Sequence, residues 1–497
     1  MKSDEYKSDN KPTSGNGLSR RNFLRLSGLG IVAVEGMNVP GMPALAKADK
    51  TVPAVPGTGS LPVNLPYREY QFEITKKEVN PDGTPVTALT INGQIPGPEI
   101  RVTEGDLLRF VVKNGLEDQP VTIHSHGLIL PSSMDGVPKI SQRPVYPGEE
   151  FVYQYLVRQT GTYWYHSRYQ LQEQIGLFGP LIIEPRREPM SYDQEYVIMI
   201  NDWLHSDPYQ IVPNLRKQSM KPMAGEMEME KPDLADVNYP SFLMNGHGIN
   251  NPSEFKAKPG DLIRFRIINA CASSYFYFMV DDHELSVTHV SGQPVNPVPV
   301  DNILVASGER YDVLVRLRSS GAFGIRGVAQ DGSLQALGIL RTKGAKSQVS
   351  KEIPKITGRG LNIDDLVSPV STLPPEAPNR VYNLTLDGNM PKYVWMMGNQ
   401  VYPKADPLIV KSGERVRVEL TNTTSMYHPM HLHGHFFRVM GLKAGETHAP
   451  LLDTVSVPPL KKIAFEFFTD NPGRWFFHCH NLYHLETGMA REIHYKV

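Results

Sequence analysis

Hydrophobic and polar residues alternate in three similar stretches of the chain, at 105–114, 260–269 and 413–422. Each stretch opens with Gly-Asp or Gly-Glu, continues with apolar residues at every second position, and closes with Asn. Alternation of this kind predicts a β-strand with one buried face. The stretches begin 155 and 153 residues apart, so the sequence predicts three related β domains.

The composition supports an all-β chain of 497 residues, because 41 Gly and 42 Pro suit many short strands joined by turns. Roughly 150 residues of short strands per repeat are typical of a β-sandwich with Greek-key connections. We therefore expect domains at 47–186, 187–345 and 379–497, with a linker at 346–378.

Residues 1–46 carry the features of an export signal in the expected order. A twin-arginine pair at 20–21 precedes the apolar run 26–34, and Ala-Leu-Ala at 44–46 offers small residues for cleavage. This segment resembles a twin-arginine signal, which predicts export to a bacterial periplasm. The apolar run is too short to span a bilayer, and the sequence has no other membrane-length apolar segment, so we expect no stable membrane insertion.

Charge and histidine content narrow the function further. The formal net charge is −1 at pH 7, which gives no reason to expect nucleic acid as a partner. The 16 histidines are uneven, with nine in the last seventy residues. This distribution suggests a metal site that the C-terminal domain helps to form.

Pairs of the form His-X-His occur in the first and third repeats but not in the middle one. The pairs are His124/His126, His431/His433 and His478/His480. Alternate strand residues point to the same face, so each pair presents both imidazoles on one side. The segment 161–168 also aligns without a gap on 473–480. The pattern predicts a metal site between the outer domains, with the middle domain as a spacer.

The position of Cys479 predicts a second metal site, because in a strand its side chain must point away from those of the two flanking histidines. It can bind a separate metal with His484 and the upstream His428, and Met489 can supply a weak axial contact. Two His, one Cys thiolate and an axial Met are the ligands of a blue-copper electron-transfer centre. The backbone of residues 478–480 would then join that centre to the histidine cluster.

These residues resemble the multicopper oxidases, and the resemblance covers essentially the whole chain after residue 46. The motifs at 163–167, 172–174, 478–480 and 488–489 are most similar to periplasmic copper-resistance oxidases, which are laccase-like. The resemblance implies three cupredoxin-like domains and up to four copper ions in type 1, type 2 and type 3 centres. It assigns His428, Cys479, His484 and Met489 to the type 1 copper, His124 and His431 to the type 2 copper, and His126, His166, His433, His478 and His480 to the type 3 pair.

The resemblance also implies a reaction, in which single electrons enter at the type 1 copper, pass through Cys479 and reduce dioxygen to water at the cluster. The reductant is expected to be Cu(I) or a small phenolic compound. Four methionines in the predicted loop 219–230 favour Cu(I), a soft ion that thioethers select, and hence a role in copper tolerance. We expect the protein to be a monomer.

Arg168 departs from the family pattern, because symmetry with His480 predicts histidine at this position. A guanidinium has no lone pair and cannot replace imidazole on copper. Water, hydroxide or a side chain such as Gln170 could complete the shell, or Arg168 could swing away from a distorted cluster. The alternative function is therefore a copper-binding or electron-carrying protein with an impaired cluster.

Asp135 is a further candidate, because it resembles the family's acidic residue near the type 2 site. There it would orient water or relay protons. The sequence leaves open a plain turn role for this aspartate before Gly136.

Overall fold

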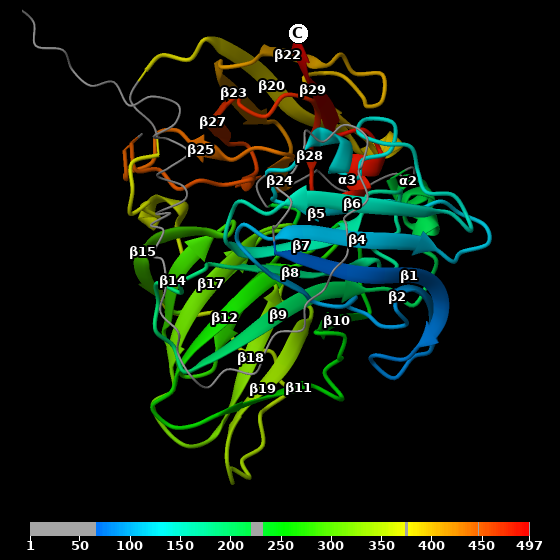
Figure 1. Cartoon of the computed structure of the whole chain (residues 1–497). Helices are drawn as coiled ribbons and strands as arrows, with labels where there is room; N and C mark the ends of the chain where they lie inside the picture. The colour runs from blue at the N-terminus through cyan, green and yellow to red at the C-terminus, as the bar shows by residue number, and fades with distance from the viewer. Residues whose placement is uncertain (1–65, 220–231, 373–375, 446, 497) are drawn as a thin grey trace, which may run out of the picture. The chain divides into compact units, whose positions relative to one another are not determined.

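The computed structural model describes residues 66–219, 232–372, 376–445 and 447–496. These residues form six β-sheets that build three sandwiches, which confirms the predicted fold class (Figure 1). The predicted signal at 1–46 lies outside the described residues, as does the predicted Met-rich loop except for Ser219, which ends a helix. Within the described ranges, the structure has no helix of the length and apolarity that a membrane crossing needs.

The first sandwich consists of the sheets β2-β1-β4-β6 and β3-β8-β7-β5. Its strands are β1 (Tyr67–Val79), β2 (Val86–Ile91), β3 (Ile100–Thr103), β4 (Leu107–Asn114), β5 (Ile123–His126), β6 (Glu150–Leu156), β7 (Gly161–Ser167) and β8 (Phe178–Glu184), with the 3-10 helix η1 (Ser132–Met134). The neighbouring strands β5 and β7 carry the histidines of this domain.

The middle sandwich consists of the sheets β10-β9-β12-β17-β14-β15 and β11-β19-β18-β13-β16. Its elements are β9 (Gln194–Trp203), η2 (Pro208–Gln210), α2 (Ile211–Ser219), β10 (Ser241–Met244), β11 (Ser253–Ala257), β12 (Leu262–Asn269), β13 (Phe276–Val280), β14 (Leu285–Val290), β15 (Gln293–Val300), β16 (Ile303–Val305), β17 (Arg310–Arg316), β18 (Ala322–Ala329), β19 (Gln335–Thr342) and, beyond the sheets, η3 (Ile363–Asp365).

The third sandwich consists of the sheets β21-β20-β23-β27-β25 and β22-β29-β28-β24-β26. Its elements are β20 (Arg380–Asn389), η4 (Met390–Lys392), β21 (Val394–Met397), β22 (Leu408–Lys411), β23 (Arg415–Asn422), β24 (His428–Leu432), β25 (Phe437–Val439), β26 (Thr454–Val457), β27 (Lys462–Phe468), β28 (Arg474–Cys479), α3 (Leu482–Glu486) and β29 (Ala490–Lys496). The neighbouring strands β24 and β28 are the counterparts of β5 and β7.

The three predicted repeats are the equivalent strands β4, β12 and β23, and the closing Asn of each has one structural role. Asn114, Asn269 and Asn422 are buried, and the side-chain amide of each donates to a carbonyl oxygen of the following loop. The side-chain oxygen of each accepts a backbone N–H two residues further on. This paired hydrogen bonding satisfies backbone groups where each strand ends and explains why Asn recurs there.

A buried apolar cluster joins the first and middle sandwiches behind β7. Trp164 of β7 and Phe178 of β8 pack with Met199 of β9 and Ile268 of β12, all at most 1% exposed. Burial of large apolar side chains is the main favourable term in such an interface. The cluster therefore fixes β7, and with it His166, relative to the middle sandwich.

Candidate metal centres

Two strand pairs, one in each outer sandwich, present the predicted cluster histidines. In the first sandwich His124 lies opposite His166, and in the third His431 lies opposite His478. The register is therefore the same on both sides, which is the structural basis of the match between 161–168 and 473–480. The predicted cluster histidines, each at most 1% exposed, are His124, His126, His166, His431, His433, His478 and His480.

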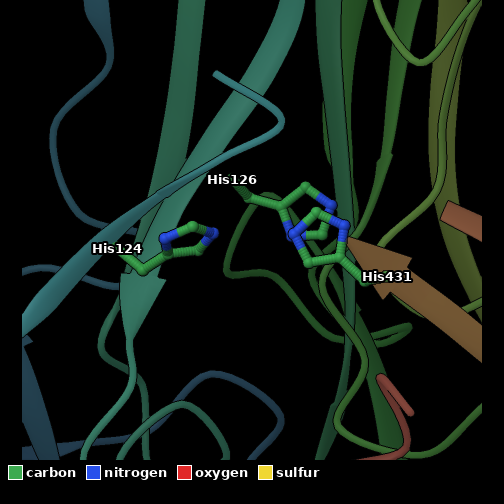
Figure 2. A group of neighbouring side chains, drawn as sticks. All are labelled: His124, His126 and His431. Atoms are coloured by element: carbon green, nitrogen blue, oxygen red, sulfur yellow. The ribbon is translucent and has the colours of Figure 1, made fainter. Parts of the chain in front are cut away.

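Two groups of three histidines each bring ligand nitrogen atoms within 4.8 Å of one another. The first group comprises His124, His126 and His431, and the second comprises His126, His166 and His480. Figure 2 shows the first group, in which the rings of His126 and His431 stack with centroids 3.7 Å apart and His124 lies across from them. Both groups combine residues of the first and third sandwiches, so the cluster lies between the outer domains as the sequence predicts.

The rings are held from outside and leave one nitrogen free. His124 Nδ1 lies 2.7 Å from the carbonyl oxygen of Asp135, and His431 Nδ1 lies 2.8 Å from that of Asp453. Five buried ring nitrogens have no hydrogen-bond partner in the described part of the chain: His124 Nε2, His126 Nδ1, His166 Nε2, His431 Nε2 and His480 Nε2. Metal-binding histidines are oriented in this way by outer partners. The donor set therefore fits copper, which imidazole suits.

Burial also sets the protonation state of the cluster. It lowers the pKa of His433 and His480 to about 3, and it lowers the pKa of His126, His166, His431 and His478 well below the ordinary value. Each of these imidazoles is therefore neutral at pH 7 and keeps a lone pair for a metal.

Two buried aspartates hold the cluster symmetrically. The carboxylate of Asp135 lies 2.9 Å from His433 Nδ1 and 3.2 Å from His124 Nδ1, while Asp453 Oδ1 lies 3.4 Å from His126 Nε2. The carbonyl of each aspartate contacts a histidine of its own domain, and the carboxylate of each reaches a histidine of the other outer domain. Burial opposes ionisation of Asp135, but His433 and His124 outweigh it and lower the pKa of the carboxyl.

Asp453 is a functional residue that no local sequence pattern marks. It follows His431 by 22 residues, whereas Asp135 follows His124 by 11, so spacing does not identify it. Arg310 of the middle sandwich pairs with both carboxylate oxygens of Asp453, at 2.7 and 2.6 Å. This fully buried pair holds the Asp453 carboxyl group beside the histidines.

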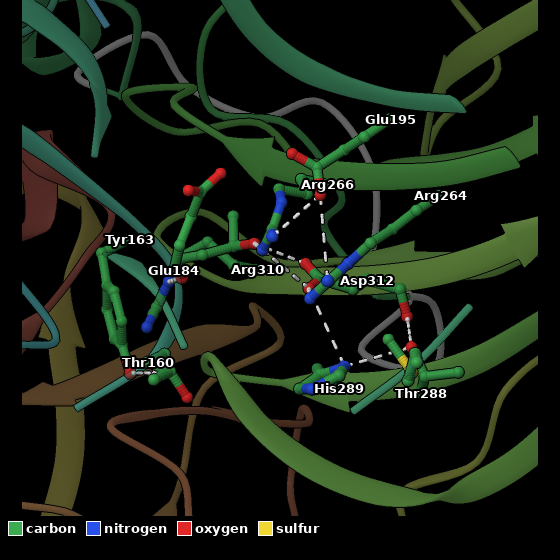
Figure 3. Close-up of polar contacts among 12 residues, drawn as sticks. Thr160, Tyr163, Glu184, Glu195, Arg264, Arg266, Thr288, His289, Arg310 and Asp312 are labelled. Carbon is green, nitrogen blue, oxygen red and sulfur yellow. Dashed lines mark hydrogen bonds and ion pairs between the residues drawn. The ribbon is translucent and has the colours of Figure 1, made fainter. Parts of the chain in front are cut away.

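The middle sandwich is more than the predicted spacer. Ser307 Oγ lies 3.2 Å from His480 Nδ1, so a hydroxyl of this domain orients a cluster histidine. Figure 3 shows Arg310 near a second buried charge network, in which Arg264 pairs with Asp312 at 2.6 Å. Asp312 also accepts a hydrogen bond from Thr162 of β7 at 2.6 Å. This domain therefore positions ligands on both sides without placing a histidine in the cluster.

The predicted blue-copper residues form a separate buried group on the opposite face of β28. Cys479 Sγ lies 3.7 Å from both His428 Nδ1 and His484 Nδ1, and these two nitrogens are 3.2 Å apart. The main chain brings Met489 to the same place, because Cys479 N–H donates to its carbonyl oxygen at 3.0 Å. Burial raises the pKa of the Cys479 thiol, so metal binding there must release a proton.

Residues outside the predicted set hold this second group. His484 Nε2 lies 2.7 Å from Asp236 Oδ2, which also accepts a hydrogen bond from Tyr393 at 2.6 Å. The rings of Trp395 and His484 lie 3.8 Å apart. No local pattern marks Asp236 in the sequence, because its partners lie more than 150 residues away.

Arg168 is buried at the end of β7 and points into the protein. Its Nη1 lies 3.4 Å from Glu173 Oε2, and the same oxygen lies 2.7 Å from His166 Nδ1. Glu173 is therefore a further functional candidate, and in the sequence only its place in the motif at 172–174 marks it. Gln170 does not complete the shell, because its side chain is exposed and accepts a hydrogen bond from Tyr209.

The remaining histidines lie outside both groups. His435 is buried but contacts the carbonyl of His433 and the hydroxyl of Tyr495. His205 pairs with Asp82, and His494 pairs with Glu492 near the surface. These contacts give His435, His205 and His494 local partners away from the two metal groups.

Family models of multicopper oxidases match the chain three times, at residues 73–188, 194–345 and 374–497. The chain is 34% identical to "Multicopper oxidase MmcO" of Mycobacterium tuberculosis, over 97% of this chain and 99% of that protein. It is 31% identical to "Copper resistance protein A" of Escherichia coli, over 87% of this chain and 94% of that protein.

A solved structure agrees with these sequence matches. The laccase from Botrytis aclada superimposes with a TM-score of 0.73 at 27% identity, covering 86% of this chain and 87% of that one. The likeness extends through all three sandwiches.

Proposed function

This chain belongs to the multicopper oxidase family and is a copper-dependent oxidoreductase, and we propose that it couples one-electron oxidation of Cu(I) or phenolic substrates to reduction of dioxygen to water. The observation that carries the proposal is the placement of two donor groups on opposite faces of β28. We assign His428, Cys479, His484 and Met489 to type 1 copper, His124 and His431 to type 2 copper, and His126, His166, His433, His478 and His480 to the type 3 positions.

Bound copper would supply one-electron redox chemistry at the Cys479 group and dioxygen chemistry at the histidine groups. The protein's own part is to connect the two. Cys479 is covalently joined through the backbone to His478 and His480, so no gap in bonding separates the groups. Asp135, a buried carboxylate in contact with His124 and His433, is placed to hold or pass a proton beside the cluster.

The sequence that precedes Asp236 favours Cu(I) as the substrate. Four methionines lie at 220–229, and the chain reaches Asp236, the partner of His484, soon afterwards. Soft thioethers favour Cu(I). Names of relatives that refer to copper resistance support a role in copper tolerance.

Deletion of 220–230 tests this preference. We expect Cu(I) oxidation to fall while oxidation of an organic reductant by the same preparation is retained. Equal losses for both substrates, or no loss, would contradict a copper-specific role. One dioxygen consumed per four electrons donated would establish the overall reaction.

Arg168 favours a second candidate function, a copper-binding or electron-transfer protein whose histidine cluster is impaired. Both functions predict a blue protein, so colour does not separate them. Oxygen uptake with a reductant supports the oxidase, whereas a type 1 signal without uptake supports the electron-transfer protein.

We also propose periplasmic export through the twin-arginine signal at 1–46 and a monomeric state, with domains at 47–186, 187–345 and 379–497. Replacing Arg20 and Arg21 by Lys should retain the protein in the cytoplasm, which cell fractionation measures. Size-exclusion chromatography measures the oligomeric state.

A further inference from the structure

One position in the histidine cluster, the His433/His478 corner, has fewer donor side chains than the other positions. His433 Nε2 and His478 Nε2 face each other at 3.0 Å, and their Nδ1 atoms are engaged by Asp135 and by the carbonyl of Cys479. Among the described residues that form groups of three possible metal ligands, His478 does not occur. This corner therefore offers two imidazoles where the His126 group offers three.

Arg168 stands where a third imidazole would complete this corner. It follows β7 at the position that His480 holds after β28, because the two strands share one register with their partners. The Arg168 side chain is 2% exposed, so its charge is held inside the protein. A guanidinium has no lone pair to donate and repels a metal cation.

Among the described residues, no third His, Cys, Asp or Glu side chain joins His433 and His478 in a group of possible metal ligands. The Asp135 carboxylate is bound to the outer nitrogens of His433 and His124. Glu173 lies against the outer nitrogen of His166 and against Arg168 itself. Gln170 is exposed. The contact of Arg168 with Glu173 holds the guanidinium in place within the fold.

Resting on the proposed function, we propose that Arg168 excludes copper from the His433/His478 corner, so that these two of the assigned type 3 positions stay without an ion, and that its charge replaces the missing ion. The chain then holds about three copper ions, at the Cys479 group, at His124/His431 and at the His126/His166/His480 group. Of the two residues that flank Cys479, only His480 then belongs to a site that holds copper, since His478 lies at the empty corner.

An empty His433/His478 corner would change the electron paramagnetic resonance signal of the bound copper, whether or not the protein turns over substrate. Two adjacent Cu(II) ions of a complete type 3 pair couple and give no electron paramagnetic resonance signal. With one corner empty, the copper at His126/His166/His480 loses its partner and becomes visible. In the copper-loaded full-length protein, we expect about three coppers per chain, nearly all of them visible by spin counting.

The variant Arg168→His supplies the third imidazole. We expect about four coppers per chain and a visible fraction that falls to about half. Blue absorption from the Cys479 group checks that the variant folds. Arg143→His is the matched control, because Arg143 is an exposed arginine paired with Glu149, and it should leave both the copper count and the visible fraction unchanged.

The unmodified protein decides the question even if Arg168→His does not fold. Four coppers with half of them silent in the unmodified chain would overturn the inference while leaving the oxidase function intact. Three visible coppers in a protein that consumes no oxygen would support the inference and refute the oxidase function. An unchanged copper count in folded Arg168→His would overturn the role given to Arg168.

Discussion

The ends of β7 and β28 are the same piece of structure with different chemistry. Both strands pair with a His-X-His strand in one register, yet β7 ends in His166-Ser167-Arg168 and β28 in His478-Cys479-His480. Ser167 Oγ donates to Gln172 at 2.8 Å and accepts from the N–H of Tyr169, so it is fully occupied by its own loop. Cys479 Sγ instead faces two histidines.

In both strands the backbone scaffold determines where the side chains point, and the identity of each side chain determines whether it can bind copper. A hydroxyl in place of a thiol removes one copper site, and a guanidinium in place of an imidazole removes another ligand. Both changes lie in the first domain, and neither alters the strand pairing.

Cys479→Ser makes β28 resemble β7 and has the largest expected effect. We expect loss of the blue absorption and a fall in substrate oxidation larger than the 10–100-fold typical of residues that orient ligands. Visible absorption and an oxygen electrode measure the two. Cys271→Ser is the matched control, since Cys271 is a buried free cysteine whose thiol contacts the carbonyl oxygen of Ile200 and belongs to none of the groups of possible metal ligands in the described part of the chain. A blue Cys479→Ser protein would refute the assignment.

His480→Arg copies the departure of β7 onto β28. It removes a ligand of the His126/His166/His480 group, so we expect about one copper fewer per chain and no oxygen uptake, while the blue absorption remains. Elemental analysis measures the copper content. His494→Arg, near the surface on β29, should keep the full copper content. An unchanged count in His480→Arg would contradict the assignment of this group.

The two buried aspartates are expected to affect different properties: Asp453 mainly the stability of the fold, and Asp135 mainly copper binding. Asp453→Ala leaves the fully buried Arg310 without its partner, which should lower the free energy of unfolding of the metal-free protein by about 3–5 kcal/mol. Asp135→Asn should cost less, because asparagine keeps a side-chain oxygen beside the ring nitrogens of His433 and His124, but should weaken copper binding about 10–100-fold. Urea unfolding and copper titration measure the two effects. Equal losses of stability would contradict this division.

The smallest expected effect is a difference between the unmodified chain and Arg168→His in the stability that each loses when copper is removed. Each bound ion stabilises the native state by about 2.7 kcal/mol at a free concentration 100 times its dissociation constant. The urea midpoint should therefore fall when a chelator strips the protein. If the Arg168 corner gains a site in Arg168→His, this variant should lose more stability on stripping than the unmodified chain. Identical losses would argue against the gained site.

Local pattern was sufficient for much of the fold and for the ligand candidates. Alternation marks β4, β12 and β23 because each strand buries one face, and His-X-His on a strand fixes a shared face. Glu173, Asp236 and Arg310 escape such reasoning, because each acts through a contact with another strand or loop. Arg310 reaches its partner Asp453 across 143 residues, a separation that no short window contains.

The cluster is made of residues from the two halves of the chain, and this affects how the protein matures. Asp135 meets His433 across 298 residues, and His126 meets Thr454 across 328. Contacts of such sequence separation form late, since long loops must close first. The interdomain histidine groups cannot exist on a growing chain that lacks its last domain. Copper uptake by these groups is thus a signal that synthesis and folding are complete, and an unfinished chain is protected from capturing a reactive metal there.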